Sequence, residues 1–177
     1  METYALLIAL GMLLGFIGDL FMANLIRIPS FEHVLGGMAA FGLGHVIYIA
    51  AILTLTQQLD LVFVWLALAV CLLVGLVGWY VVVFRGQQPT VLHYAALPYA
   101  LLLASTTGAA LSLALSIPAF GLLALGAALF LVSDLILAAQ LFNNLRFPLI
   151  SDVVWLTYGP AQMLIVYSVG TALGLLA

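Results

Sequence analysis

The chain has 177 residues, of which 67% are hydrophobic and 5% are charged, and its formal net charge is −3. A soluble globular domain carries about 25% charged residues, so this composition excludes a water-facing surface over most of the chain. The small, scattered charge gives no footprint for a nucleic-acid partner. The length fits one transmembrane helical domain covering residues 1–177.

Six stretches are long and apolar enough to cross a membrane, which takes roughly 20 residues per helix. In chain order they are residues 4–22, 34–56, 61–84, 91–113, 118–141 and 151–174. The breaks at 27–30, 57–60, 85–89, 116–118 and 143–148 carry turn-forming or charged residues. Because the apolar runs are continuous rather than alternating, the sequence predicts an all-α, polytopic transmembrane helix bundle of about six spans.

Two of these stretches need an argument of their own. The first contains Asp19, and Glu2 precedes it where a signal peptide would have basic residues, so we expect a membrane helix. The break at residues 116–118 is the weakest, but without it the fourth and fifth stretches would form one helix of about 50 residues, far beyond the length of a span. The single cysteine, Cys71, lies inside the third stretch and is expected to pack rather than react.

The three basic side chains predict the orientation of the bundle. Arg27, Arg85 and Arg146 fall in the first, third and fifth breaks, so six spans place them all on one side. The positive-inside rule makes that side cytoplasmic and puts both termini outside. We expect a multi-pass protein of the plasma membrane.

Small residues recur at spacings that allow helices to approach closely, as in Gly11-x-x-x-Gly15 and Gly121-x-x-x-x-Gly126. They predict helix packing and say little about function.

Polar side chains within the spans gather toward the arginine side. Each is costly in a bilayer and therefore needs a reason. At 1.5 Å per residue, they lie roughly 5 to 18 Å from that boundary. They are Asp19, His45, Tyr94, Asp134, Tyr158 and Gln162. Simpler interpretations exist for most of them: a carboxylate reaching the interface, a packing histidine, or tyrosines of an aromatic belt, which is the favoured interpretation for Tyr99. His33 and His93 stand at span edges and are expected to be interfacial.

Asp134 is the hardest of these residues to explain structurally. It stands in an apolar run, the chain contains no lysine, and all three arginines lie in loops. A carboxyl group in such surroundings, without a cationic partner, is a candidate for the proton-carrying general acid of an enzyme.

Four short motifs occur in chain order. They are Gly18-Asp19-Leu20, Gly37-x-x-x-Phe41-x-x-x-His45-x-x-Tyr48, Phe130-x-x-Ser133-Asp134-x-x-x-Ala138, and Thr157-Tyr158-x-x-Ala161-Gln162. Together they resemble the YhhN-like lysoplasmalogenase family of integral membrane proteins. Members usually have about eight spans, whereas six are predicted here, and Gly159 stands where a second aromatic residue is usual.

The resemblance implies hydrolysis of the vinyl ether bond of a lysoplasmalogen, which releases a fatty aldehyde and a glycerophospho-base. It also implies that Asp19 and Asp134 are the catalytic pair. Two acids suit this chemistry, as in glycosidases, because one must protonate carbon and the other can stabilise the resulting cation or activate water. The deeper Asp134 is assigned as the acid and Asp19 as the base or cation stabiliser, with exchanged roles left open.

Supporting residues follow from the same motifs. His45, Tyr48, Tyr94, Ser133, Tyr158 and Gln162 are expected to bind or position the substrate and water. The expected partners are a lysophospholipid substrate and membrane lipid, with no cofactor, no metal and no nucleic acid. A homo-oligomer and the identity of the natural lipid are left open.

Three other functions compete with this interpretation. A small proton-coupled transporter could use Asp19, His45 and Asp134 as a relay, but no inverted repeat accompanies them. A metal-dependent lipid hydrolase could use the same three residues as ligands, but no His-x-x-x-His motif or cysteine cluster supports it. A structural subunit would leave the clustered acids unexplained.

Overall fold

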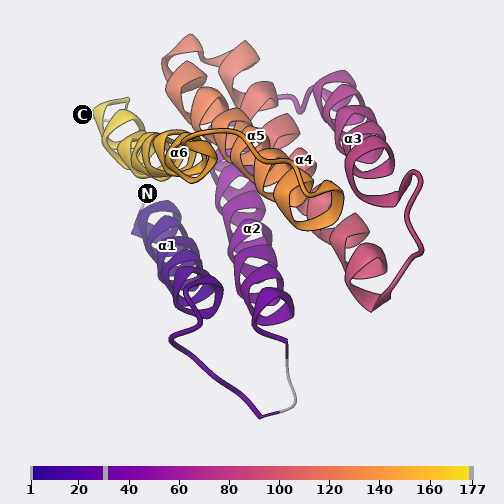
Figure 1. Cartoon of the computed structure of the whole chain (residues 1–177). Coiled ribbons are helices and arrows are strands. Elements are labelled where there is room, and N and C mark those ends of the chain that lie inside the picture. The colour runs from indigo at the N-terminus through magenta and orange to yellow at the C-terminus, as the bar shows by residue number, and fades with distance from the viewer. Residues whose placement is uncertain (1, 30–31, 176–177) are drawn as a thin grey trace.

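The computed structural model describes residues 2–29 and 32–175, and it is a bundle of long helices (Figure 1). Six helices in this part of the chain are long and apolar enough to span a membrane. They are α1 (Glu2–Met22), α2 (His33–Gln58), α3 (Trp65–Trp79), α4 (Val91–Ser116), α5 (Gly121–Asn143) and α6 (Ile150–Gly174). A π-helical turn, η1 (Tyr80–Phe84), extends α3, and a 3-10 turn, η2 (Pro118–Phe120), precedes α5. The predicted all-α multi-pass architecture is confirmed.

The predicted breaks are also found, with one correction. The third helix begins at Trp65 rather than near residue 61, because Asp60 has a left-handed backbone (φ 51°) and the residues after it run extended. The Val64 N–H donates to the Ser112 hydroxyl over 2.7 Å, which satisfies a backbone group that the helix would otherwise have paired. The weak break near Ser116 is confirmed. Ser30, the last residue of the first predicted break, lies outside the described residues.

Five helices form a closed ring and one lies outside it. α2 packs against α1 and α4, α5 packs against α4 and α6, and α6 returns to α1. α3 packs on α4, at the edge of the bundle in Figure 1, and η1 reaches α5. The ring closes between the first and last helices, where the Tyr4 and Ser168 hydroxyls are 2.6 Å apart. Its interior is therefore lined by α1, α2, α4, α5 and α6.

Glycines on α1 let neighbouring side chains reach its backbone. A Cβ at Gly11 would lie 2.3 Å from the Tyr48 ring, and one at Gly15 would lie 2.8 Å from Gln162 Nε2. The predicted packing role of Gly11 and Gly15 is confirmed. In the second predicted motif, a Cβ at Gly126 would lie 2.9 Å from the Ala161 carbonyl oxygen, so its packing role is confirmed. Gly121 faces open space, so its predicted packing role is wrong.

The outward surface of the bundle is apolar. Large side chains that are more than half exposed occur on several helices, for example Phe16, Leu43, Leu73 and Tyr167. A bilayer would cover this surface. The polar side chains that matter for chemistry lie inside the ring.

Candidate active site

Two aspartates from different helices project into the ring, and each accepts a hydrogen bond from a tyrosine. Tyr158, on α6, donates to Asp19 on α1 over 2.9 Å. Tyr99, on α4, donates to Asp134 on α5. The rings of His45 and Phe130 connect the two tyrosines. Residues separated by more than 100 positions in the sequence are thus joined in one site.

A chain of polar contacts leads from Asp19 toward the centre of the bundle. The Gln162 amide donates to the Tyr158 hydroxyl over 3.1 Å, and the Tyr48 hydroxyl donates to the Gln162 carbonyl over 3.0 Å. Tyr48 and Gln162 are buried, and both rest on the α1 glycines. This network fixes the Tyr158 hydroxyl beside Asp19, because every member has a partner on a second helix or one turn away.

His45 occupies the middle of the site with a defined tautomer. Its Nδ1 is 3.0 Å from the Thr106 hydroxyl, and that hydroxyl donates its one proton to the Leu102 carbonyl. Thr106 must therefore accept from His45, which places the imidazole proton on Nδ1 and leaves an acceptor lone pair on Nε2. His45 is 1% exposed, and its Nε2 has no hydrogen-bond partner among the described residues.

Aromatic rings pack around the site. Phe130 contacts His45 and Tyr158 edge to face, with ring centroids 4.6 and 5.2 Å apart. Phe41 contacts Phe130 and Tyr158, each at 6.0 Å. Edge-to-face packing of this kind is favourable, and it gives the site rigid, water-poor walls.

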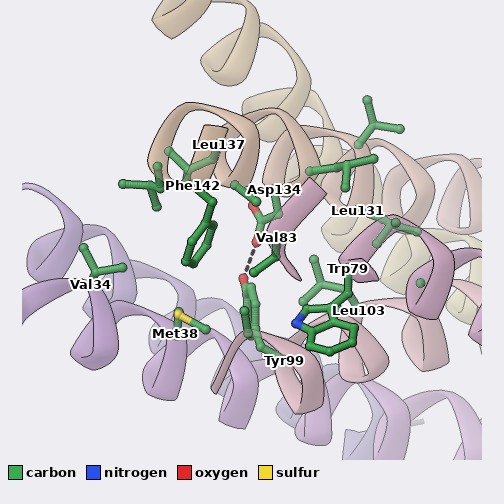
Figure 2. Close-up of a pocket in the computed structure, with 18 of the residues that line it drawn as sticks. Val34, Met38, Trp79, Val83, Tyr99, Leu103, Leu131, Asp134, Leu137 and Phe142 are labelled. Carbon is green, nitrogen blue, oxygen red and sulfur yellow. Dashed lines mark hydrogen bonds between the residues drawn. The ribbon is translucent and has the colours of Figure 1, made fainter. Parts of the chain in front are cut away.

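Asp134 also faces an apolar cavity of about 160 Å³ between α2, α3, α4 and α5. Figure 2 shows the Tyr99–Asp134 hydrogen bond in its wall, with Val34 and Met38 on one side and Trp79 and Leu103 on the other. Asp134 is half-buried, and its free surface belongs to this cavity. Asp19 does not line the cavity. The two acids therefore have different surroundings, one apolar and one polar.

Residues 1–169 of the chain match the YhhN family. The protein belongs to the YhhN family. The match covers all four motifs that carry the resemblance, and hence both aspartates. Comparison of this YhhN-family chain with curated proteins and with solved structures gave no significant match.

The structure of this YhhN-family protein brings together most of the predicted site residues: Asp19, His45, Tyr48, Asp134, Tyr158 and Gln162. Two of the predicted residues lie elsewhere. Tyr94 is 58% exposed at the start of α4 and contacts Phe84, away from both acids. The Ser133 hydroxyl donates to the Val154 carbonyl, so this buried serine joins α5 to α6.

Tyr99 corrects the sequence interpretation. The aromatic-belt position favoured for it is wrong, because its hydroxyl points inward to Asp134 and its ring contacts His45. The depth of Tyr99 along its helix could have predicted this inward position. Tyr99 is eight residues into α4, about 12 Å deep, which is the depth of Asp134 rather than of a headgroup belt. The histidines predicted to be interfacial stand at helix starts, where His33 is exposed and His93 caps α4 through Thr90.

No group of three or more His, Cys, Asp or Glu side chains that could hold a metal ion occurs in residues 2–29 and 32–175. Within the site, the His45 Nδ1 atom is already paired with Thr106.

Proposed function

We propose that this YhhN-family protein is a membrane-embedded hydrolase that cleaves the vinyl ether bond of a lysoplasmalogen-type lipid. The products would be a fatty aldehyde and a glycerophospho-base. The single observation that carries the proposal is the pair of tyrosine-bonded carboxyl groups on separate helices, of which Asp134 faces an apolar cavity and Asp19 faces a polar network. The family is generally associated with hydrolase activity.

The apolar setting of Asp134 supports its role as the acid. Hydrolysis of a vinyl ether begins with transfer of a proton to the carbon next to the hydrocarbon chain. The donor must therefore meet hydrocarbon, and Asp134 lines the cavity whereas Asp19 does not. The transfer leaves an oxocarbenium ion on the substrate and a carboxylate on Asp134.

The polar setting of Asp19 supports the complementary role. Its carboxylate would stabilise the oxocarbenium ion and accept the proton of the water that adds to it, which gives a hemiacetal. In the collapse, the bond to the glycerol oxygen breaks and that oxygen receives the proton from Asp19. The hemiacetal hydroxyl proton returns to Asp134. One water is consumed, and both acids regain their starting states.

The depth of the site suits this substrate. Asp134 lies nine residues from the end of α5, about 13 Å below that end of the helix. We propose that the arginine loops face the cytoplasm of a plasma membrane, so that the site lies within the depth of the inner leaflet, where a lysolipid of that leaflet can reach it.

The test is direct. Purified protein would be incubated with a panel of lysolipids that have the same headgroup and a vinyl ether, an alkyl ether or an ester at sn-1, and aldehyde release would be measured. We expect aldehyde from the vinyl ether alone. Release of fatty acid from the ester at a comparable rate would replace this proposal with an esterase.

A proton-coupled carrier is the second candidate, since the contacts Asp19–Tyr158–Gln162–Tyr48 form a continuous polar path. Proteoliposomes separate the two functions. A carrier would move protons or solute across a sealed membrane without consuming lipid, whereas the hydrolase would consume lipid in detergent as well.

A further inference from the structure

The helix that lies outside the ring forms one wall of the cavity beside Asp134. α3 and η1 contribute Val74, Gly75, Gly78, Trp79 and Val83. Two hydrogen bonds hold this wall in place. The Trp79 indole N–H donates to the His93 carbonyl over 3.0 Å, and the Asn143 amide donates to the Val82 carbonyl in η1 over 2.8 Å. The wall is thus tied to α4 and α5 and is a built part of the cavity.

The lining has one chemical character with a single exception. Apart from Asp134 and Tyr99, the lining consists of aliphatic and aromatic side chains, glycines, and the thioethers of Met22 and Met38. The hydrogen-bonded pair of Asp134 and Tyr99 is therefore the one place in the lining where a polar group of a ligand would find a partner. The Trp79 N–H is already used by His93. A phosphate or an ammonium group would lose its hydration here without compensation.

The length of the cavity suits a hydrocarbon chain. On α5 the lining runs from Leu131 to Phe142, a rise of eleven residues or about 16 Å along the helix. This is about half of the 30 Å hydrocarbon core of a bilayer, which is the depth of one leaflet.

We infer that this cavity binds the hydrocarbon chain of a single-chain lipid and sets which chain lengths the protein accepts. The inference rests on the proposed function for the identity of the chain, which is that of the substrate, since Asp134 lies in the cavity wall. Gly78 offers a way to close the cavity. A Cβ there would meet Leu135 at 3.4 Å, an ordinary contact, and Gly78 lines the cavity, so substitution by leucine adds bulk to the cavity wall.

Trp79 provides a reporter that does not depend on turnover. The chain has three tryptophans, and Trp65 and Trp155 are 72% and 61% exposed on the outer surface. Replacing both by Phe leaves Trp79 as the only indole. An alkyl ether lysolipid with a brominated chain would quench Trp79 fluorescence on binding, and the absence of a vinyl group prevents cleavage.

In this background we expect saturable quenching that an unbrominated lysolipid reverses. Gly78→Leu should reduce the saturable part at least tenfold at a fixed probe concentration. Gly170→Leu is the matched control, since Gly170 is exposed on α6 with nothing near its Cβ position, and it should leave quenching unchanged. Equal, non-saturable quenching in both variants would overturn the inference, as would equal quenching by a brominated diacyl lipid.

The enzymatic readout is separate. With vinyl ether lysolipids, Gly78→Leu should shift the preference for chain length toward shorter chains by at least tenfold in kcat/KM, while Gly170→Leu should not. Saturable quenching without aldehyde release would support the hydrocarbon-chain site and contradict the proposed reaction. Aldehyde release without saturable quenching would support the reaction and contradict the hydrocarbon-chain site.

Discussion

Tyr99, on α4, donates its hydroxyl hydrogen bond to the Asp134 carboxyl group on α5, across the wall of the apolar cavity. Tyr158 makes the equivalent bond to Asp19, but its hydroxyl also accepts from Gln162. Each acid therefore accepts a hydrogen bond from a tyrosine, but only the tyrosine bonded to Asp19 is itself held by a further side-chain hydrogen bond. This difference is the structural basis for giving them different roles.

Removal of the Asp134 carboxyl proton should stop the reaction. Asp134→Asn keeps the shape of the side chain but cannot deliver a proton to carbon, and loss of a general acid typically costs about 10²- to 10⁴-fold in rate. Aldehyde release per folded protein is the measurement, with circular dichroism to check folding. Asp152→Asn, at an exposed acid of the first turn of α6, is the control and should retain activity. Wild-type rates in Asp134→Asn would remove Asp134 from the mechanism.

The Tyr99 hydroxyl should matter where that of Tyr94 does not. Tyr99→Phe deletes the donor to Asp134, and a hydrogen bond to a charged group is worth about 1.5–3 kcal/mol, so we expect kcat to fall about tenfold or more. Tyr94→Phe removes a hydroxyl from a side chain that is 58% exposed, five residues earlier on the same helix, and should leave kcat within about twofold. Equal effects of the two substitutions would show that the Tyr99–Asp134 bond has no catalytic role.

The tautomer of His45 can be measured directly. Imidazole ¹⁵N chemical shifts should report a proton on Nδ1 and a bare Nε2 in the native protein, because Thr106 accepts from Nδ1. Thr106→Val removes that acceptor and should abolish the preference, whereas Thr106→Ser should keep it. A native protein with the proton on Nε2 would contradict this account of the site.

The glycines of α1 should be sensitive to a single methyl group. Gly11→Ala places a Cβ 2.3 Å from the Tyr48 ring, so Tyr48 must shift and its bond to Gln162 must weaken. Overpacking of this kind costs about 1–3 kcal/mol, which a lower thermal unfolding temperature in detergent would register. Gly170→Ala faces open space and serves as the comparison. Similar melting temperatures for the two variants would argue against close packing at Gly11.

The sequence predicts depth along each helix better than rotation about it. Hydropathy located all six spans, and counting residues from their ends brought Asp19, Asp134 and Tyr158 to one level. Rotation decides what a side chain at that level touches, and the apolar runs offer little to fix it, because lipid-facing and core-facing residues are equally hydrophobic. Tyr99 was misplaced for this reason, and the contact of the Ser133 hydroxyl with the Val154 carbonyl was not foreseen.

The cavity lay beyond sequence analysis altogether. Nothing in the third stretch marks Gly78 and Trp79 as neighbours of Asp134, since the two segments are more than 50 residues apart and meet through tertiary packing. Likewise, the pairing of His45 with Thr106 depends on how α2 lies against α4. Such contacts need coordinates, because a single chain carries no local signal for them.

The bond between Asp19 and Tyr158 joins residues 139 positions apart, in the first and last helices. During biosynthesis α1 enters the membrane first, and its aspartate waits for a partner until the ribosome has delivered α6. A chain shortened before α6 would therefore keep the Asp19 carboxyl group without this partner, so the polar network around Asp19 is among the last contacts of the bundle to form.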